Sequence, residues 1–365
     1  MKAVAVFFGG QSVEHDISII TGVMTANSIK GQNFIAIPIY VSKTGLWFTG
    51  KQLLDLDNYK SLNLNKLTRV CLTGGDNSLY QIKKNKLKKI DALSVAINCM
   101  HGERGEDGAL KGLLSMCNIP LASPDMMPSS ICIDKTFTKT VLRAINVKTL
   151  PSLTVSSIEE VLKNQKKFTY PLIVKPNKLG SSIGVSRVEN QTQLYSAVNY
   201  ALRFGDKAII EKCLENFIEI NCACYLDSHN NLIVSECERP IGRTEVLSFD
   251  DKYKNGKRVF PADISTKLAE KIKSTTKQIY QKLNFTGIIR IDYFIVEEQI
   301  FVNEINTVPG SLAYYLFGDT IKSFQSLLEE LLQKALKDYA QSLSTQKTYK
   351  ADILSFTGGK SAKRL

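Results

Sequence analysis

The stretch from residue 286 to residue 311 limits most strongly what this chain can fold into, because it reads as two strands joined by a short turn. Apolar and polar residues alternate along it, and this period of two is typical of a strand with one buried face. The side chains expected on the buried face are Ile289, Ile291, Tyr293 and Ile295 in the first strand and Phe301 and Ile305 in the second. The stretch therefore predicts an antiparallel hairpin with one face in a hydrophobic core.

The polar face of this hairpin gathers oxygen-bearing side chains. If the turn is centred near Glu298, then Asp292 lies opposite Glu304. The same register sets Arg290 opposite Asn306, although a bulge at the turn would shift the pairing. Opposed like charges destabilise a sheet, and carboxylate and amide oxygens are hard ligands that suit magnesium bound together with phosphates. The hairpin thus presents either a metal site or simply a solvated face.

The size and composition of the chain point to a globular protein. Its 365 residues are enough for two or three domains, and its apolar fraction of 44% is ordinary. No apolar run approaches the roughly 18 residues of a membrane span, and the first one stops at Gly9-Gly10, too soon for a secretory signal. The eight cysteines show no metal-ligand spacing. We therefore expect a cytoplasmic protein whose cysteines are structural thiols.

The net charge of +12 is compatible with nucleic acid, an anionic membrane or a phosphate-bearing substrate as the partner. The clearest basic run, residues 83–89, lies between two short apolar stretches and reads as a solvated hairpin tip. No aromatic residues interleave with it, as a protein that binds single strands would prefer. A phosphate-bearing small molecule is therefore favoured, and neither nucleic acid nor membrane is expected as a partner.

Two segments near the N-terminus place polar residues after strands. Residues 2–8 read as a buried parallel strand, and the helix that follows would point its free N–H groups at a ligand. Glu14 at this point either binds a ligand ammonium or only complements the helix dipole. His101 follows another predicted strand, 92–98, and stands among glycines, in the usual ligand position of an open α/β sheet. It serves either a ligand or a local hydrogen bond.

The pattern changes near Ser123-Pro124, where we place the first domain boundary. Beyond it, a predicted strand over 172–174 ends at Lys175 and leads into a glycine–serine loop over 178–184. Its glycines let the backbone approach an anion, and its serines add donors. It is not a P-loop, because Gly-Lys-Ser/Thr does not follow. The long polar stretch 239–261 is of the length usual for a lid or a disordered segment.

Eight short motifs occur in order along the chain: FFGGQSVEHDIS, HGERGEDG, IDK, VKPNKLGSSIGVS, IIEK, DDKY, RID and NEINTVPGS. From Ala3 to about Leu343 this series resembles the D-alanine–D-alanine ligases of the ATP-grasp superfamily. The resemblance implies an α/β (α+β) fold with an N-terminal open parallel sheet and two antiparallel-sheet domains that hold ATP between them. The domains expected are 1–123 for substrate, 124–213 as the central ATP-grasp domain and 214–345 as the catalytic domain, with a tail over 346–365.

The resemblance also implies which residues bind the nucleotide and the metal. The residues implied in ATP binding are Lys135, Lys175, Ser181, Ser182, Glu211, Lys212, Glu219 and Lys252. Among them, Lys135 and Lys175 look like the phosphate contacts, and Glu219 looks like the acid at the ribose. The metal ligands implied are Asp292, Glu304 and Asn306, for two Mg²⁺ ions or Mn²⁺ in their place.

The catalytic and substrate residues follow from the same resemblance. Arg290 looks like the arginine that stabilises charge in the transition state. Tyr253 looks like the tyrosine that forms a hydrogen-bonded triad with Glu14 and Ser181. The first D-alanine subsite is implied at Glu14 and His101, and the second subsite at Gly310, Ser311 and Leu312.

The reaction implied is the ATP-dependent ligation of two D-alanines for peptidoglycan precursors, through an acyl phosphate. The partners implied are D-alanine, ATP and a second copy of the chain in a homodimer. The open alternatives are a ligase that uses D-serine or, less well supported, D-lactate as the second substrate, and a nucleotide-binding regulatory protein without turnover. Tyr253 disfavours D-lactate, because depsipeptide ligases of this family carry histidine there. A basic nucleic-acid binder fits less well than any of these.

Two positions depart from the family's pattern. The family commonly has a longer turn between its Pro-Gly pair and the Ser-Leu pair that holds the second substrate's carboxylate. Here Ser311 follows Gly310 directly, and we take Ser311 as that contact. The predicted lid has 248–251 in place of the usual Tyr-Asp-Tyr run, while Lys252 and Tyr253 are kept.

Overall fold

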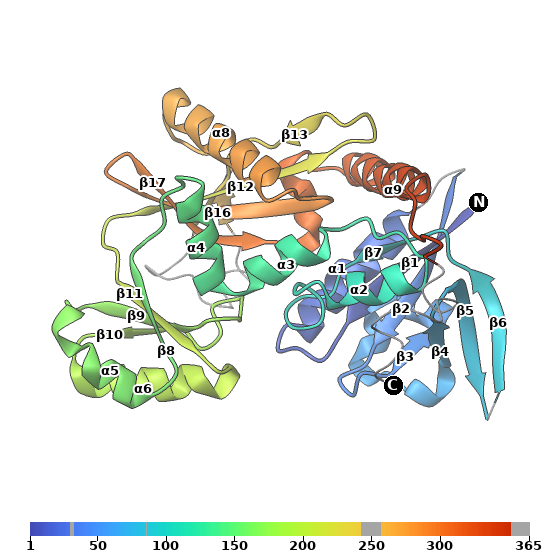
Figure 1. Ribbon diagram of the computed structural model, residues 1–365, viewed down its shortest axis with the longest axis horizontal. Helices are drawn as coiled ribbons and strands as arrows, with labels where there is room; N and C mark the ends of the chain where they lie inside the picture. Colours follow the sequence, from blue (N-terminus) through green and yellow to red (C-terminus); the bar gives the residue numbers. More distant parts are fainter. Residues whose placement is uncertain (30–32, 85, 242–256, 352–365) are drawn as a thin grey trace, which may run out of the picture.

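The computed structural model describes residues 1–29, 33–84, 86–241 and 257–351. Within these residues the strands form three large sheets and one two-stranded ribbon (Figure 1). The seven-stranded N-terminal sheet lies to one side, and two four-stranded sheets face each other on the other side. No helix in these ranges combines the length and the apolar character that crossing a membrane requires.

The N-terminal sheet is mixed, with the strand order β6-β5-β4-β3-β2-β1-β7. Its parallel part is β1 (Lys2–Gly9), β2 (Phe34–Val41) and β7 (Val95–Asn98). Its antiparallel part is β3 (Trp47–Thr49), β4 (Thr68–Thr73), β5 (Asp76–Lys83) and β6 (Lys86–Ala92). The parallel sheet predicted here is thus extended by hairpins. The short 3-10 helices η1 (Lys51–Leu54), η2 (Leu56–Ser61) and η3 (Leu64–Lys66) connect β3 to β4.

The central strand β1 is buried on both faces, as its unbroken apolar run predicts. Val4, Val6 and Phe8 face α1 (His15–Ser28) on one side of the sheet. The alternate residues Ala3, Ala5 and Phe7 share a core with α2 (Ala109–Met116) on the other side. Because the sheet is covered on both sides, the loops that leave the carboxyl ends of β1 and β7 are held in fixed positions.

The central unit is a four-stranded antiparallel sheet with the order β10-β9-β11-β8. Its strands are β8 (Ser152–Val155), β9 (Leu172–Pro176), β10 (Ser186–Val188) and β11 (Ala208–Lys212). Helices α5 (Ile158–Lys163) and α6 (Gln191–Ala201) cover one face, with η4 (Gln165–Lys167) and η5 (Leu202–Phe204) beside them. Their apolar side chains form a core of their own, separate from the other cores.

The third sheet has the order β13-β12-β16-β17, and α8 (Thr266–Lys282) covers it. Its strands are β12 (Ile218–Leu226), β13 (Leu232–Val234), β16 (Ile288–Val296) and β17 (Gln299–Asn306). Helices α3 (Met126–Ile133) and α4 (Lys135–Ala144) also belong to this core through Cys132 and Leu142. The segment 126–147, which lies within the predicted domain 124–213, thus contributes apolar side chains to the core of the third sheet.

The predicted hairpin is β16 and β17, and the register around its polar residues is confirmed. Asp292 pairs with Glu304 and Arg290 with Asn306. The register shifts directly after Asp292, where a bulge adds a residue to β17. The bulge reverses the alternation beyond it, so that Ile300 and Val302 enter the core with Ile305. The expectation that Phe301 shares this face is therefore wrong, because Phe301 pairs with Phe294 on the opposite face.

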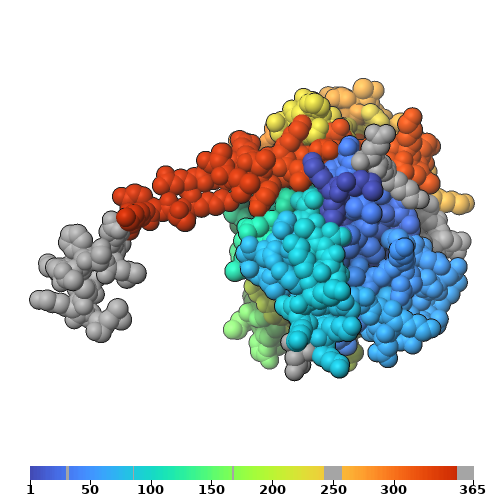
Figure 2. All heavy atoms as spheres, turned by 90° about the vertical axis from the view of Figure 1, so that its right-hand side faces the viewer, coloured from blue at the N-terminus to red at the C-terminus, as the bar shows by residue number. Residues whose placement is uncertain are grey.

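The last helix of the chain returns to the first sheet. After the 3-10 segment η6 (Gly310–Leu316), α9 (Ile321–Leu343) packs its leucines into the core that holds Val4 and Val6. The helix begins with a capping box between Thr320 and Ser323. Figure 2 shows α9 running from the body of the molecule past the N-terminal unit. The predicted catalytic domain, 214–345, thus shares its end with the N-terminal core.

Replacing Gly22 by alanine should destabilise the protein. A Cβ atom built at Gly22 would stand 2.2 Å from the Cβ of Phe8, so α1 must move away from β1. We expect the free energy of unfolding to fall by about 1–3 kcal/mol in urea titrations, in spite of the better helix propensity of alanine. Gly74 is the control, because nothing lies within 4 Å of its added Cβ. An equal loss in both variants would contradict the tight packing of α1 on β1.

Candidate active site

Two cavities meet between the three sheets. The first cavity lies between the central and third sheets, and its polar lining is Lys135, Lys175, Ser182, Glu211, Lys212, Glu219, Asn303 and Glu304. The second, of about 400 Å³, includes Glu14, His101, Glu106, Ser181, Arg290, Asn306, Gly310 and Ser311 in its lining. Gly180, Glu219 and Glu304 line both cavities. Molecules in the two cavities would therefore come into contact beside these three residues.

A buried carboxylate with two lysines forms the floor of the first cavity. The Glu211 Oε2 atom lies 2.7 Å from Nζ of Lys175, and Oε1 lies 2.5 Å from Nζ of Lys139. Burial alone would raise the pKa of Glu211, but Lys175 and Lys139 hold that pKa below its ordinary value. Lys175 also donates to Oδ1 of Asn303, at 3.2 Å. The arrangement keeps the charged ends of these side chains fixed.

Lys139 and Asn303 were not identified from the sequence. Lys139 follows Lys135 by four residues, which places both on one face of α4, so helical spacing could have found it. Lys135 is the first residue of α4, and its Nζ donates to the carbonyl of Leu179 at 2.6 Å. Burial lowers the pKa of both lysines. A phosphate beside Lys135 would favour its charged form.

The loop between β9 and β10 projects over both cavities. Ser181 and Ser182 have left-handed backbones, with φ of 53° and 57°, which cost energy in residues other than glycine. The site therefore uses an unusual backbone conformation to hold this loop, and the hydroxyl of Ser181 donates to Oε1 of Glu14. A Cβ at Gly180 would stand 3.3 Å from that oxygen, so glycine leaves the loop room there.

Glu14 is the most informative residue of the second cavity. It precedes α1, is only 5% exposed, and accepts from Ser181 with Oε1. Its Oε2 atom is buried and has no hydrogen-bond partner within the described residues. Burial, and then the charge of Glu106, raise the pKa of Glu14. A buried carboxylate oxygen without a donor is costly, so this position is suited to a ligand that brings a cationic donor.

His101 lies beside Glu14 at the carboxyl end of β7. Its Nε2 atom is 3.2 Å from Oγ1 of Thr21, and its Nδ1 atom is 3.9 Å from Oε1 of Glu106. The other oxygen of Glu106 accepts from the backbone N–H of Gly102, at 2.9 Å. Sequence reasoning did not select Glu106, whose only signal was its place in the glycine-rich loop. The structure brings His101, Glu106 and Glu14 to one end of the cavity.

The polar face of the hairpin forms the opposite wall. Nε and Nη2 of Arg290 lie 2.7 and 2.8 Å from the two oxygens of Asp292, which is 1% exposed. Nδ2 of Asn306 donates to Asp292 at 3.0 Å. Within the described residues, no three His, Cys, Asp or Glu side chains gather as a metal cluster. A metal here would have two carboxylates and the amide oxygen of Asn306, a set of hard ligands that fits magnesium.

The short turn after β17 contains the three residues predicted for the second subsite. Gly310 and Ser311 line the second cavity, but Leu312 is buried in the N-terminal core. The reason is that Ser311, Leu312 and Ala313 all have φ near 50°, a left-handed turn that directs Leu312 inward. Tyr315, in the same segment, lines the cavity, and its hydroxyl accepts from Nη1 of Arg290 at 3.3 Å. No pattern in the sequence indicates this contact of Tyr315.

The remaining predicted residues fall into two groups. Glu219 lines both cavities from β12, opposite Phe294, and Lys212 reaches the edge of the first cavity with an exposed side chain. Lys252 and Tyr253 lie outside the described residues, whereas the two ends of the predicted lid form the strands β14 (Arg239–Ile241) and β15 (Lys257–Val259).

Comparisons with known proteins agree with this geometry. A model described as D-ala D-ala ligase N-terminus matches residues 3–124, and one described as D-ala D-ala ligase C-terminus matches residues 142–336. The D-alanine–D-alanine ligase of Thermosipho melanesiensis is 35% identical over 352 residues, which are 93% of this chain and 95% of that protein. D-alanine–D-alanine ligase A of Escherichia coli is 31% identical over 361 residues, 92% and 96% of the two chains.

Solved structures give the same result. The D-alanine–D-alanine ligase from Helicobacter pylori superposes with a TM-score of 0.78 at 28% identity, covering 92% of this chain and 98% of that one. The VanG D-Ala:D-Ser ligase from Enterococcus faecalis also gives 0.78, at 25% identity, with 92% and 99% covered.

Two antiparallel sheets that close over buried lysines are the arrangement of the ATP-grasp enzymes, and this chain has that fold. The family models and the relatives narrow the class further. The chain belongs to the D-alanine–D-alanine ligase family. Its reaction is accordingly the ATP-dependent joining of two D-alanines for peptidoglycan synthesis.

Replacing Glu14 by glutamine should stabilise the ligand-free protein at neutral pH. Because the folded-state pKa of Glu14 is raised, stability from this group is present below the ordinary value of 4.5 and is lost as pH rises through the raised pKa. The amide of glutamine does not titrate, so the variant does not lose stability in this way. Thermal unfolding should therefore show nearly equal melting temperatures at ~pH 4 and a higher one for the variant at ~pH 8.

The matched control is Asp16→Asn, an exposed acid on the same helix, which should change the melting temperature little at either pH. If Glu14→Gln melted at a lower temperature than the wild type at ~pH 8, the charged Glu14 carboxylate would be stabilising the fold, and the prediction would be wrong.

Proposed function

We propose that the first cavity binds ATP, that the second binds two D-alanines, and that ligation takes place where the two cavities meet. The observation that carries this proposal is the buried, unpartnered Oε2 of Glu14 in a cavity that Arg290 also lines. An amino acid offers an ammonium to Glu14 and a carboxylate to a cation. The proposal therefore assigns the two charged ends of the substrates to acidic and basic groups of the same cavity.

The nucleotide roles follow the lining of the first cavity. Phe217 and Phe294 meet edge to face at 4.9 Å and provide an apolar wall for the adenine ring. Glu211 and Lys212, at the end of β11, read its polar edge, and Glu219 binds the ribose. Lys135, Lys175, Ser182 and the Ser181 backbone then face the phosphates, and Lys252 belongs to the same set. Phosphoryl transfer depends on such positioning and charge neutralisation more than on covalent help.

The chemistry proceeds in two steps at the junction. Glu14 and His101 hold the ammonium of the first D-alanine, so that its carboxylate attacks the γ-phosphorus, breaking the bond to ADP and forming an acyl phosphate. The amine of the second D-alanine then attacks the acyl carbon, loses a proton and expels phosphate. Arg290 stabilises the negative charge that develops. Tyr253 completes the triad with Glu14 and Ser181, while Gly310 and Ser311 border the second substrate.

Two Mg²⁺ ions, or Mn²⁺, form part of the proposal, with Asp292, Glu304 and Asn306 as their ligands. When bound, the metal neutralises phosphate charge. Glu304 lines both cavities and Asn306 lines the second, whereas Asp292 is held by Arg290 and becomes a ligand only by sharing or releasing an oxygen. Donor chemistry supports this assignment.

We also infer that the protein is a cytoplasmic homodimer, as the family resemblance implies. Light scattering would test the dimer.

A direct assay tests the function. Purified protein with ATP and Mg²⁺ should release ADP with D-alanine alone and form D-alanyl-D-alanine, identified by mass spectrometry. D-Alanine plus D-serine is the second candidate, because the turn at Gly310 is shortened and the VanG structure is that of a D-Ala:D-Ser ligase. Preferential formation of the mixed D-serine dipeptide would overturn the choice of second substrate. ATP binding without ADP release would favour a regulatory protein.

Glu304→Gln should keep the fold and lose most turnover. Removing one carboxylate from the pair opposite Asp292 weakens the neutralisation of phosphate charge, a contribution of several kcal/mol. ADP release should fall at least about 100-fold, with little change in melting temperature. Glu298→Gln, in the exposed turn of the same hairpin, is the control and should keep full activity. Near-normal turnover of Glu304→Gln at saturating Mg²⁺ would refute the metal assignment.

A further inference from the structure

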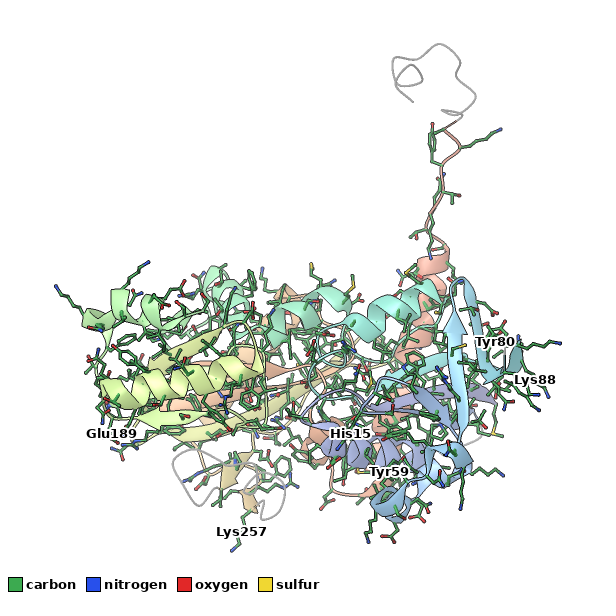
Figure 3. The ribbon with its side chains drawn as sticks, turned by 90° about the horizontal axis from the view of Figure 1, so that it is seen from below. His15, Tyr59, Tyr80, Lys88, Glu189 and Lys257 are labelled. Atoms are coloured by element: carbon green, nitrogen blue, oxygen red, sulfur yellow. The ribbon has the colours of Figure 1, made fainter. Side chains whose placement is uncertain are left out.

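Arg258 enters the second cavity from the two-stranded ribbon of β14 (Arg239–Ile241) and β15 (Lys257–Val259). Its neighbour Lys257 also borders this cavity, but its exposed side chain points away from the body of the molecule (Figure 3). Successive side chains of a strand point to opposite faces, so Arg258 is directed back over the cavity. Its side chain is 30% exposed, which leaves the guanidinium accessible to a ligand.

The guanidinium of Arg258 is held in place from one side. Nη1 lies 3.4 Å from Oε1 of Glu238 and 3.2 Å from the carbonyl of Tyr315. The guanidinium carbon stands 5.0 Å from the ring centres of both Phe260 and Tyr315, a cation–π arrangement. Within the described part of the chain, Nε and Nη2 have no hydrogen-bond partner. The group is thus positioned while most of its donors remain available.

The residues behind Arg258 fix its position. Glu238 is buried, and its Oε2 accepts from Nδ2 of Asn221 at 3.1 Å, so the carboxylate that orients Arg258 cannot rotate freely. Tyr315 connects Arg258 with Arg290, because its ring contacts the first and its hydroxyl accepts from the second. The lining of the cavity therefore contains two arginines that are connected through Tyr315.

These two arginines differ in what they can still bind. Arg290 uses Nε and Nη2 on Asp292, while Arg258 has both of these nitrogens free of partners in the described residues. The shortened turn offers little in compensation. The backbone N–H of Ser311 donates to Thr21 at 3.3 Å, and Leu312 lies in the core. Among these groups, Arg258 is the cation best prepared for a new anion.

We propose that Arg258 binds the carboxylate of the second D-alanine and thereby selects an amino acid with a free carboxylate. Its planar fork matches a carboxylate with two parallel hydrogen bonds. This inference rests on the proposed function, since it assigns one end of the second substrate. The alternative is a purely structural role. Arg258 would then only hold the ribbon of β14 and β15 against the turn at Tyr315, and its loss would weaken the binding of every substrate alike.

The test compares Arg258→Met with Arg239→Met. Arg239 lies on the partner strand of the same ribbon, pairs with Asp263 and is absent from the cavity, so the control removes the same charge and side chain. In Arg258→Met the KM for the second D-alanine should rise about 10- to 100-fold, as for a lost charge-assisted hydrogen bond. The KM values for ATP and the first D-alanine should stay within about twofold, and Arg239→Met should match the wild type.

A competition assay separates carboxylate recognition from a purely structural role. Equal concentrations of D-alanine and D-alaninamide are supplied with ATP and Mg²⁺, and mass spectrometry gives the ratio of D-alanyl-D-alanine to D-alanyl-D-alaninamide. This ratio does not depend on the fraction of folded enzyme. The wild type should favour D-alanine, and Arg258→Met should lose about 10- to 100-fold of that preference. Arg258→Lys, which keeps a charge beside Glu238, should lose less.

An unchanged product ratio in Arg258→Met would overturn the inference, whatever happens to the total rate, and would assign Arg258 a purely structural role. That outcome leaves the proposed function intact, because the wild type still makes the dipeptide. If the wild type itself forms no D-alanyl-D-alanine, the proposed function fails first. A ratio that shifts equally in Arg239→Met would show a general effect of charge and would also reject the inference.

Discussion

The pairing of Asp292 with Glu304 across β16 and β17 is the constraint on which the rest of the site depends. Two carboxylates on adjacent strands repel each other unless a cation stands beside them. Arg290 neutralises Asp292 through two short hydrogen bonds. The same strands bury isoleucines and Tyr293 on their other face, so the hydrophobic core fixes where the charges stand. The energy that places these acids side by side therefore comes from burial on the opposite face of the sheet.

The site buries several acidic side chains away from water, and they differ in their partners. Glu211 is matched by Lys139 and Lys175, and Asp292 by Arg290, so each of these buried acids has a cation of its own. Glu14 has a hydroxyl instead, and its pKa is raised by burial. A compensated carboxylate is held in place by its partner, whereas an uncompensated one retains affinity for a cation that arrives later. This difference sets Glu14 apart from Glu211 and Asp292 as the acid best suited to receive an ammonium group.

Sequence reasoning succeeded where a local pattern carries the information. Alternation and the turn at Glu298 were enough to place Asp292 opposite Glu304, and the motifs were enough to identify the family. It failed at Phe301, because a period of two cannot register the extra residue of a bulge. Tyr315 and Arg258 were missed because their contacts come from partners far away in the chain, whereas Lys139 was overlooked although its helical spacing from Lys135 is visible in the sequence. The burial of the Leu312 side chain was not foreseen, because a run of left-handed residues leaves no mark in composition.

The return of α9 to the N-terminal sheet has a consequence for motion. One continuous core joins β1, α1, η6 and α9, so the first sheet and the turn after β17 are bound to each other by buried leucines. The strands β8–β11 have a separate core and share no such helix. A rotation of this central lobe against the remainder would open the first cavity without breaking either of these two cores. Such a rotation would leave the proposed amino-acid subsites at Glu14 and the hairpin assembled and would carry away the loop that contains Ser181.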